Sequence, residues 1–242
     1  MKNTLLLLLL LIPFISNAQL DGLIKKANDK LTSPGGSGTS EIGSGLKEAL
    51  NKGVTKQVAK LTEVDGFYRN ELVKIAMPEE LKKVDKALRK MGMGDLADEG
   101  VKSLNRAAED AVKEATPIFI DAIKGMTIKD AKNILFGTDD AATDYLKGST
   151  SSALYDKFLP VVKSSIGKVG ADKIWAGIIS KYNGLPLVSK VNPDINDYVT
   201  DKAMEGVFKM IAVEEKNIRT DLSARTSPIL KRVFAMQDKK QK

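Results

Sequence analysis

Residues 199–220, VTDKAMEGVFKMIAVEEKNIRT, form the most regular segment of the chain. Their apolar side chains recur at the intervals expected for one face of an α-helix. These side chains belong to Val199, Ala203, Val207, Phe208 and Ile211. The segment therefore predicts an amphipathic helix that ends near Thr220. Beyond it, Ser227 and Pro228 are residue types preferred as the N-cap and the first residue of a final helix.

The same spacing continues toward the N-terminus. Residues 46–61 carry another apolar stripe, formed by Leu46, Leu50, Val54, Val58 and Leu61. Pro78 precedes two glutamates, which is typical of a helix start, because acidic residues there compensate the helix dipole. No segment alternates polar and apolar residues with the period of two that marks β-strands. The sequence therefore predicts an all-α fold, a single multi-helix bundle domain after a signal peptide and a flexible linker.

Proline, glycine and hydroxyl residues indicate where helices should begin and end. Pro117 should kink or split a helix, because proline lacks an amide hydrogen. Gly148 is expected to break one helix, and Pro160 to kink or interrupt another. Thr127, with an aspartate three residues later, has the spacing of a capping box. Thr138 and the two aspartates that follow it are expected to cap the next helix.

Residues 1–18 have the composition of a secretory signal peptide. Lys2 precedes an apolar run at residues 5–15, which is too short for a bilayer core that needs about 20 residues. The small residues that end at Ala18 predict cleavage before Gln19. An uncleaved membrane anchor is the alternative. We expect export to the periplasm as a soluble protein.

The mature chain is expected to begin with a segment that stands apart from the folded domain. Residues 19–45 predict a short amphipathic segment, with Leu20, Ile24 and Leu31 on one face, and then a Gly/Ser-rich linker. The helical domain is expected at residues 46–242. The amphipathic segment is a candidate for weak contact with a membrane surface.

The composition excludes several classes of chemistry, because the 242 residues include no cysteine and no histidine. Stability must come from buried apolar surface, since no disulfide can form. Ser-His-Asp and Cys-His catalysis, typical structural zinc sites and haem held by histidine or cysteine are excluded. We expect no metal and no cofactor. The net charge of +7 is mild and its charges are interspersed, which favours solubility over nucleic-acid binding.

The densest acidic cluster consists of Asp139, Asp140 and Asp144. Asp140 and Asp144 lie one helical turn apart and should share a face. Carboxylate oxygens suit Ca²⁺ or Mg²⁺, so a cation site is one interpretation. The interpretation that we favour is a helix cap with acids that compensate the helix dipole.

Two further groups combine arginine with glutamate. Asn105, Arg106 and Glu109 lie within one turn of a mid-chain helix, and Glu215 and Arg219 have the spacing of an ion pair. Such an arginine can bind a carboxylate or a phosphate. A structural salt bridge is the alternative that we favour, and the two groups are also candidates for one shared buried network. Together with the three aspartates they are the candidate ligand-binding residues, and none is assigned a catalytic role.

Short motifs spread over most of the chain carry a family resemblance. They are LKEAL at 46–50, DGF at 65–67, KALRK at 86–90, NRAAE at 105–109, PIF at 117–119, DDAAT at 139–143, DYVT at 197–200, and residues 211–219. Together they resemble the bacterial family called domain of unknown function 4197. The resemblance implies an exported helical protein of bacteria with two membranes. It implies no activity, cofactor or catalytic residue.

Three hypotheses about function stay open. The first, which we prefer, is a non-catalytic periplasmic module that binds a small ligand or an envelope protein near Arg106, Glu109 and the Asp139 helix start. The second is a histidine-free hydrolase that depends on carboxylates or a metal and uses Glu109, Asp140 and Asp144. The third is a structural factor of the cell envelope, tethered by residues 20–31.

Overall fold

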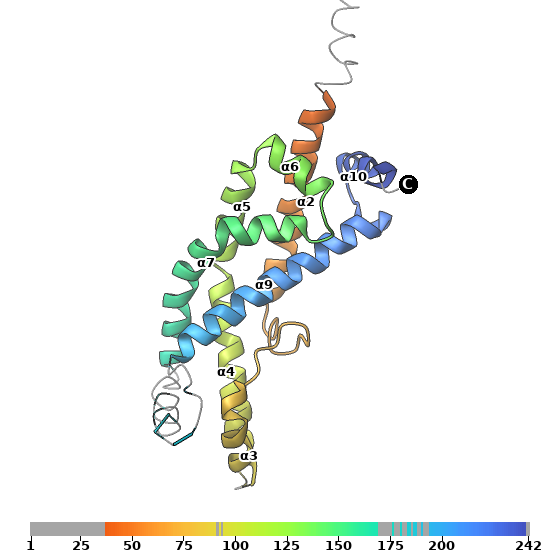
Figure 1. The fold of residues 1–242 in the computed structure, drawn as a ribbon. Helices are drawn as coiled ribbons and strands as arrows, with labels where there is room; N and C mark the ends of the chain where they lie inside the picture. Colours follow the sequence, from red (N-terminus) through yellow and green to blue (C-terminus); the bar gives the residue numbers. More distant parts are fainter. Residues whose placement is uncertain are drawn as a thin grey trace, which may run out of the picture. The chain divides into compact units, whose positions relative to one another are not determined.

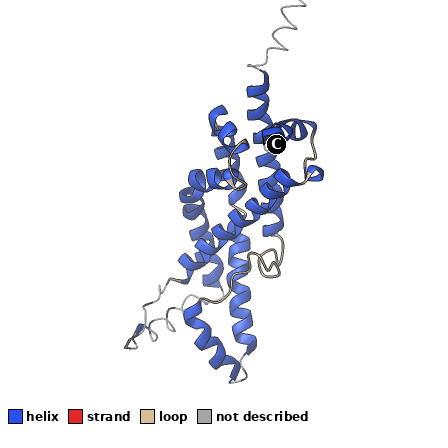
Figure 2. Cartoon of the chain, turned by 45° about the vertical axis from the view of Figure 1, so that its right-hand side comes forward, coloured by secondary structure: helices blue, strands red, loops and turns tan. Residues whose placement is uncertain are grey.

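The computed structural model describes residues 37–90, 92, 94–168 and 194–240, and also residues 176, 180, 183, 184, 186, 187 and 190. Its contacts divide the chain into two units, Met1–Ser40 and Glu41–Lys242. Of the first unit only residues 37–40 are described, as the first turn of a helix, so the predicted signal peptide and amphipathic segment lie outside the described residues. The described part contains helices and no strand, which confirms the all-α prediction (Figure 2).

The helices follow one another with short connections, apart from the segment between α2 and η1 and the one between α7 and α9. In chain order they are α2 (Ser37–Thr62), η1 (Glu79–Leu81), α3 (Lys82–Lys90), α4 (Gly94–Val112), α5 (Ala115–Gly125), α6 (Ile128–Leu135), α7 (Ala141–Lys168), α9 (Ile195–Thr220), η2 (Leu222–Ala224) and α10 (Pro228–Lys240) (Figure 1).

Helix α9 is the centre of the folded unit Glu41–Lys242. It is the helix predicted from residues 199–220, and it packs against both α4 and α7. Ala203 and Val207 lie one helical turn apart, and neither has any exposed surface. Phe208 meets Phe119 of α5 edge to face, with ring centroids 5.9 Å apart and an interplanar angle of 85°. An edge-to-face pair of this kind adds to the free energy gained from burial of the two rings.

Helix α2 begins at Ser37, inside the stretch predicted as a Gly/Ser-rich linker. Ile42 continues the buried stripe of Leu46, so the packed face of α2 begins before residue 46. The backbone of α2 passes close to α10, since a Cβ added at Gly45 would lie 2.5 Å from Cγ2 of Val233. The predicted start of α10 is confirmed: the Leu230 amide donates to the Ser227 hydroxyl at 3.3 Å, and Pro228 is the first helical residue.

Local signals account for the boundaries around α5 and α6. Pro117 lies in the first turn of α5, and the chain splits into α4 and α5 just before it, as predicted. A proline is tolerated there because first-turn amides have no partner within the helix. Thr127 and Asp130 form the predicted capping box. The Asp130 amide donates to the Thr127 hydroxyl at 3.1 Å, and the Thr127 amide donates to the Asp130 carboxylate at 2.9 Å.

The predicted break at Gly148 is wrong, and of the two effects expected at Pro160, a kink or an interruption, the interruption does not occur. Helix α7 runs without a gap from Ala141 to Lys168. A buried side chain recurs at every fourth residue from Ala142 to Ile166, so packing of the whole length overrides the weak local preferences. The Thr150 hydroxyl donates to the Leu146 carbonyl at 2.6 Å, a contact that bends helices. Figure 1 shows α7 strongly curved.

In the part of the chain that the structure describes, no helix has both the length and the apolar character needed to cross a membrane.

Candidate functional site

Glu215 of α9 caps the first turn of α7. Its carboxylate accepts the Ala142 amide at 2.9 Å, the Thr143 amide at 2.8 Å and the Thr143 hydroxyl at 2.8 Å. Amides in the first turn of a helix lack partners within the helix and carry partial positive charge, so a carboxylate satisfies both needs. Only 8% of Glu215 is exposed. The residue predicted as a candidate ligand contact is therefore bound to the protein's own backbone.

Arg219 balances the charge of Glu215 and caps a second helix. Its guanidinium donates to Glu215 through Nε at 3.0 Å and Nη2 at 2.7 Å. It also donates to the carbonyls of Ile134 at 2.8 Å and Leu135 at 3.2 Å, at the end of α6, and to Oε1 of Gln237 at 3.2 Å. A buried ion pair stabilises only when its remaining polar atoms are bonded, and these contacts meet that condition. The Glu215–Arg219 pair thus joins α6, α7, α9 and α10.

The Asn105, Arg106 and Glu109 group of α4 holds the segment between α2 and η1. Asn105 exchanges two hydrogen bonds with the Ile75 backbone, each 2.8 Å long. Glu109 accepts the Phe67 amide at 3.0 Å and pairs with Arg106. Arg106 also donates to Asp65 at 2.6 Å. The predicted ion pair is present, and its partners are the backbone and side chains of this segment.

Asp139 and Asp140 directly precede α7, Asp144 lies in its first turn, and all three are exposed. Asp140 and Asp144 line a cavity of about 440 Å³ between α7 and α9, together with Asp201 and Glu205. Burial, followed by the charges of Asp197 and Glu205, raises the pKa of Asp201. Among the described residues, no group of three or more acidic side chains is placed to hold a metal ion.

The structure does not bring the eight predicted residues together. The network around Glu109 and the network around Glu215 have no residue in common, so the shared buried network is not formed by the described contacts. Arg106 lines a separate cavity of about 280 Å³ between α4 and α7. A ligand-binding role for these residues stays a prediction.

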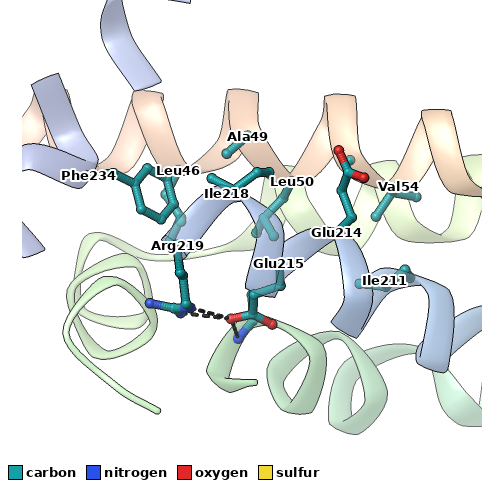
Figure 3. A pocket seen from close by; sticks show the side chains of 12 residues that line it. Leu46, Ala49, Leu50, Val54, Ile211, Glu214, Glu215, Ile218, Arg219 and Phe234 are labelled. Carbon is teal, nitrogen blue, oxygen red and sulfur yellow. Dashed lines mark hydrogen bonds and ion pairs between the residues drawn. The ribbon is translucent and has the colours of Figure 1, made fainter. Parts of the chain in front are cut away.

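A further cavity lies between α2 and α9, and it was not identified from the sequence. Its smaller part has a volume of about 30 Å³ and is lined mainly by apolar side chains. These include Leu46, Leu50 and Val54 of α2, Ile211 and Ile218 of α9, and Phe234 of α10 (Figure 3). Figure 3 also shows that Glu214 points toward α2, whereas Glu215 points toward α7. These two neighbouring glutamates therefore bond to helices on different sides of α9.

An adjoining larger part has a volume of about 300 Å³, and both apolar and polar side chains line it. It shares Ala49, Gly53, Glu214 and Ile218 with the smaller part, and Lys52, Lys56, Ser223 and Thr226 line it as well. We call the two parts together the α2–α9 groove. A Cβ at position 53 would lie 3.4 Å from Cγ of Glu214, so the absence of a side chain at Gly53 leaves space where the two parts of the groove meet.

Glu214 is held on the groove wall by two residues of α2. Lys56 Nζ donates to the two carboxylate oxygens at 2.7 and 2.9 Å, and Gln57 Nε2 donates to one of them at 2.6 Å. Gln57 is only 2% exposed, and its Oε1 atom has no hydrogen-bond partner among the described residues. Such buried unpaired acceptors are rare in proteins. Two residues predicted from the sequence, Glu215 and Arg219, line the smaller part of the groove, although the sequence did not indicate that α2 forms its other wall.

Comparisons with known proteins give one result. A family model described as protein of unknown function, DUF4197, matches residues 36–235, which is most of the chain. No curated protein and no solved structure matches the chain.

Proposed function

The chain belongs to the DUF4197 family of proteins of unknown function, and we propose that it is exported to the periplasm as a non-catalytic module that binds a small ligand in the α2–α9 groove. The observation that carries the proposal is that an apolar cavity and a cavity of about 300 Å³ with few polar groups share four lining residues. Small-molecule sites have this composition, with apolar walls and a small number of placed polar groups.

The groove is favoured over the cavity between α7 and α9, although that cavity is larger. Asp140, Asp144, Lys147, Asp201 and Glu205 all contribute to its lining, so most of its polar groups are charged. Such side chains are readily solvated at a surface, so a ligand must compete with water for them. The smaller part of the α2–α9 groove is instead lined mainly by apolar side chains, to which water cannot hydrogen-bond.

The hydrolase hypothesis receives less support. It assigned Glu109, Asp140 and Asp144 to one site. Glu109 is buried, and both of its carboxylate oxygens are bonded, one to the Phe67 amide and the other to Arg106. A carboxylate that holds the fold in this way is poorly placed to act as an acid or base.

Binding is tested with N-phenyl-1-naphthylamine, a neutral apolar dye whose fluorescence rises in apolar surroundings. The mature protein should bind it saturably. Gly53→Leu should remove binding, because the new side chain enters the groove, while Gly148→Ala should keep it, since nothing lies within 4 Å of a Cβ there. Circular dichroism confirms that both variants fold. Non-saturable fluorescence, or equal binding by folded Gly53→Leu, would sink the proposal.

Export is tested separately by the mass of the protein in the periplasmic fraction. Full-length chain should yield a product that begins at Gln19, whereas a chain without residues 2–18 should stay in the cytoplasm. Retention of the uncleaved chain in the membrane fraction would support the anchor or the envelope-associated alternative instead.

A further inference from the structure

We infer that α10 is a lid on the α2–α9 groove, and that the apolar part of the groove accepts a ligand only when α10 moves away from α2. This inference rests on the proposed function and adds to it the movement that gives access to the site. It follows from the size of the smaller part, from the residues that close it and from the contacts that hold each wall.

The smaller part of the groove cannot hold a small-molecule ligand with its walls in place. Its volume of about 30 Å³ is about the share of one molecule in liquid water, whereas ligand sites usually measure about 300 Å³ or more. The larger part has a volume of about 300 Å³, but lysine, serine and threonine side chains line it as well. A ligand that reaches the apolar side chains of the smaller part must therefore displace one of its walls.

Two of the three walls are held over a long stretch of chain. Helix α9 packs against α4 and α7, and it caps two other helices through Glu215 and Arg219. Helix α2 buries an apolar stripe from Ile42 to Leu61, which extends beyond the groove at both ends. Movement of either helix would expose a large apolar surface, and the free energy cost rises with the area exposed.

Helix α10 and the segment before it form the third wall. Phe234 lines the smaller part (Figure 3), and Leu230 lines the larger part, as do Ser223 and Thr226. Among the described side chains of α10, the buried apolar ones belong to Leu230, Val233 and Phe234. Because so few apolar side chains would be uncovered, α10 is the wall whose movement costs the least.

The C-terminal half of α10 is fixed to α9. The Arg225 guanidinium donates to the two carboxylate oxygens of Asp238 at 2.6 and 3.0 Å. It also donates to the carbonyls of Ile218 and Arg219, in the last turn of α9, at 3.0 and 2.9 Å. Gln237 accepts a further hydrogen bond from Arg219 at 3.2 Å. Arg225 and Gln237 are both buried, so these bonds are shielded from water and can act as a pivot.

The N-terminal half of α10 contacts α2 through weaker interactions. Ile229 and Val233 lie against Gly45, and Arg232 forms an ion pair with Glu41. The Arg232 side chain is exposed, and exposed ion pairs contribute little to stability. This half of α10 can therefore separate from α2 while the other half stays on α9. Since separation uncovers buried side chains, the open form is a minor state that a bound ligand stabilises.

The first test measures the opening of α10 without a ligand. The chain contains no cysteine, so an introduced thiol reports on a single position. Val233→Cys places it in α10, and Val207→Cys is the control in α9, because neither valine has any exposed surface. Iodoacetamide should alkylate Val233→Cys about a hundredfold faster than Val207→Cys, since local opening is more frequent than global unfolding. Urea unfolding corrects for any difference in global stability, and equal corrected rates would overturn the inference.

The second test locks the lid with a disulfide. Gly45→Cys and Val233→Cys are combined, because a Cβ at Gly45 would lie 3.2 Å from Cβ of Val233, close to the about 3.8 Å of a disulfide. The oxidised mature protein should bind N-phenyl-1-naphthylamine at least about tenfold more weakly than the reduced one, because the open form is no longer populated. The reduced form is the matched control, since the two forms share one sequence.

The outcomes separate this inference from the proposed function. If the dye binds saturably and Gly53→Leu removes it, but the disulfide does not weaken binding, the groove takes its ligand with α10 in place and the lid is wrong. If Val233→Cys reacts rapidly but the unaltered protein does not bind the dye, α10 opens and the proposed function is wrong. Slow alkylation without dye binding would overturn both.

Discussion

The Glu215 carboxylate caps α7 by accepting both the amide and the hydroxyl of Thr143, each at 2.8 Å, across 72 residues of sequence. The same carboxylate pairs with Arg219, which in turn caps α6. One buried ion pair on the central helix thereby orients the ends of two other helices. The same pair contributes to the α2–α9 groove, because Glu215 and Arg219 line its smaller part.

Glu215→Gln should lower the free energy of unfolding by about 3 kcal/mol. The glutamine cannot balance the buried Arg219, and loss of one partner from a buried pair typically costs this much. Urea unfolding followed by circular dichroism measures the change. Glu205→Gln is the control, since Glu205 pairs with Lys202 at the surface and should change stability by less than about 1 kcal/mol. Equal effects of the two substitutions would contradict the assigned role of Glu215.

Gly206→Ala should destabilise the fold by about 1–3 kcal/mol. A Cβ at Gly206 would lie 2.6 Å from Cε1 of Phe67, and that ring is fully buried, so it has little room to move. Gly148→Ala should instead stabilise the protein by up to about 1 kcal/mol, because it lowers the entropy of the unfolded chain at an open helical site. Thermal unfolding of both variants compares them. An unchanged melting temperature for Gly206→Ala would be inconsistent with the close approach of α9 to Phe67.

Tyr155 should ionise later than an ordinary tyrosine. The hydrogen bond that it donates to Asp197, then burial and nearby aspartates, raise its pKa to about 12. Its folded pKa thus lies above the unfolded value of about 10, so this contribution to stability is present below pH 10 and is lost as the pH rises through 12. Burial also raises the pKa of Tyr145, so absorbance titration of tyrosinate should show more than one late group, and Asp197→Asn should move only that of Tyr155 toward 10. Identical titration curves for the two proteins would refute the assignment.

The capping box of α6 should appear in the titration of one carboxyl group. The Thr127 hydroxyl, followed by the Thr127 amide, lowers the pKa of Asp130. The resulting stability is present above the ordinary pKa of about 3.9 and is lost as the pH falls through the lowered folded value. Thr127→Val should raise the pKa of Asp130 toward that ordinary value, as measured by carboxyl carbon NMR. Thr127→Ser keeps the hydroxyl and should leave it low.

Features that depend on neighbouring residues were predictable. The capping box at Thr127 needs only residues of one turn, and the apolar stripe of α9 needs only its own spacing. The continuity of α7 through Gly148 and Pro160 was not predictable, because it depends on a long buried face packed against other helices. The same holds for the groove, since Lys52 and Glu214 belong to helices far apart in the chain.

The sequence by itself determined the helical class, the helix starts at Thr127 and Ser227, and the absence of histidine and cysteine chemistry, because each follows from residue type or short-range spacing. Only the tertiary structure decided that Glu215 caps α7 and that Glu214 faces Lys56. A carboxylate can bond to any amide or ammonium that comes within reach. Which partner reaches it depends on how helices pack, and helix packing is set by buried surfaces that are distant in sequence.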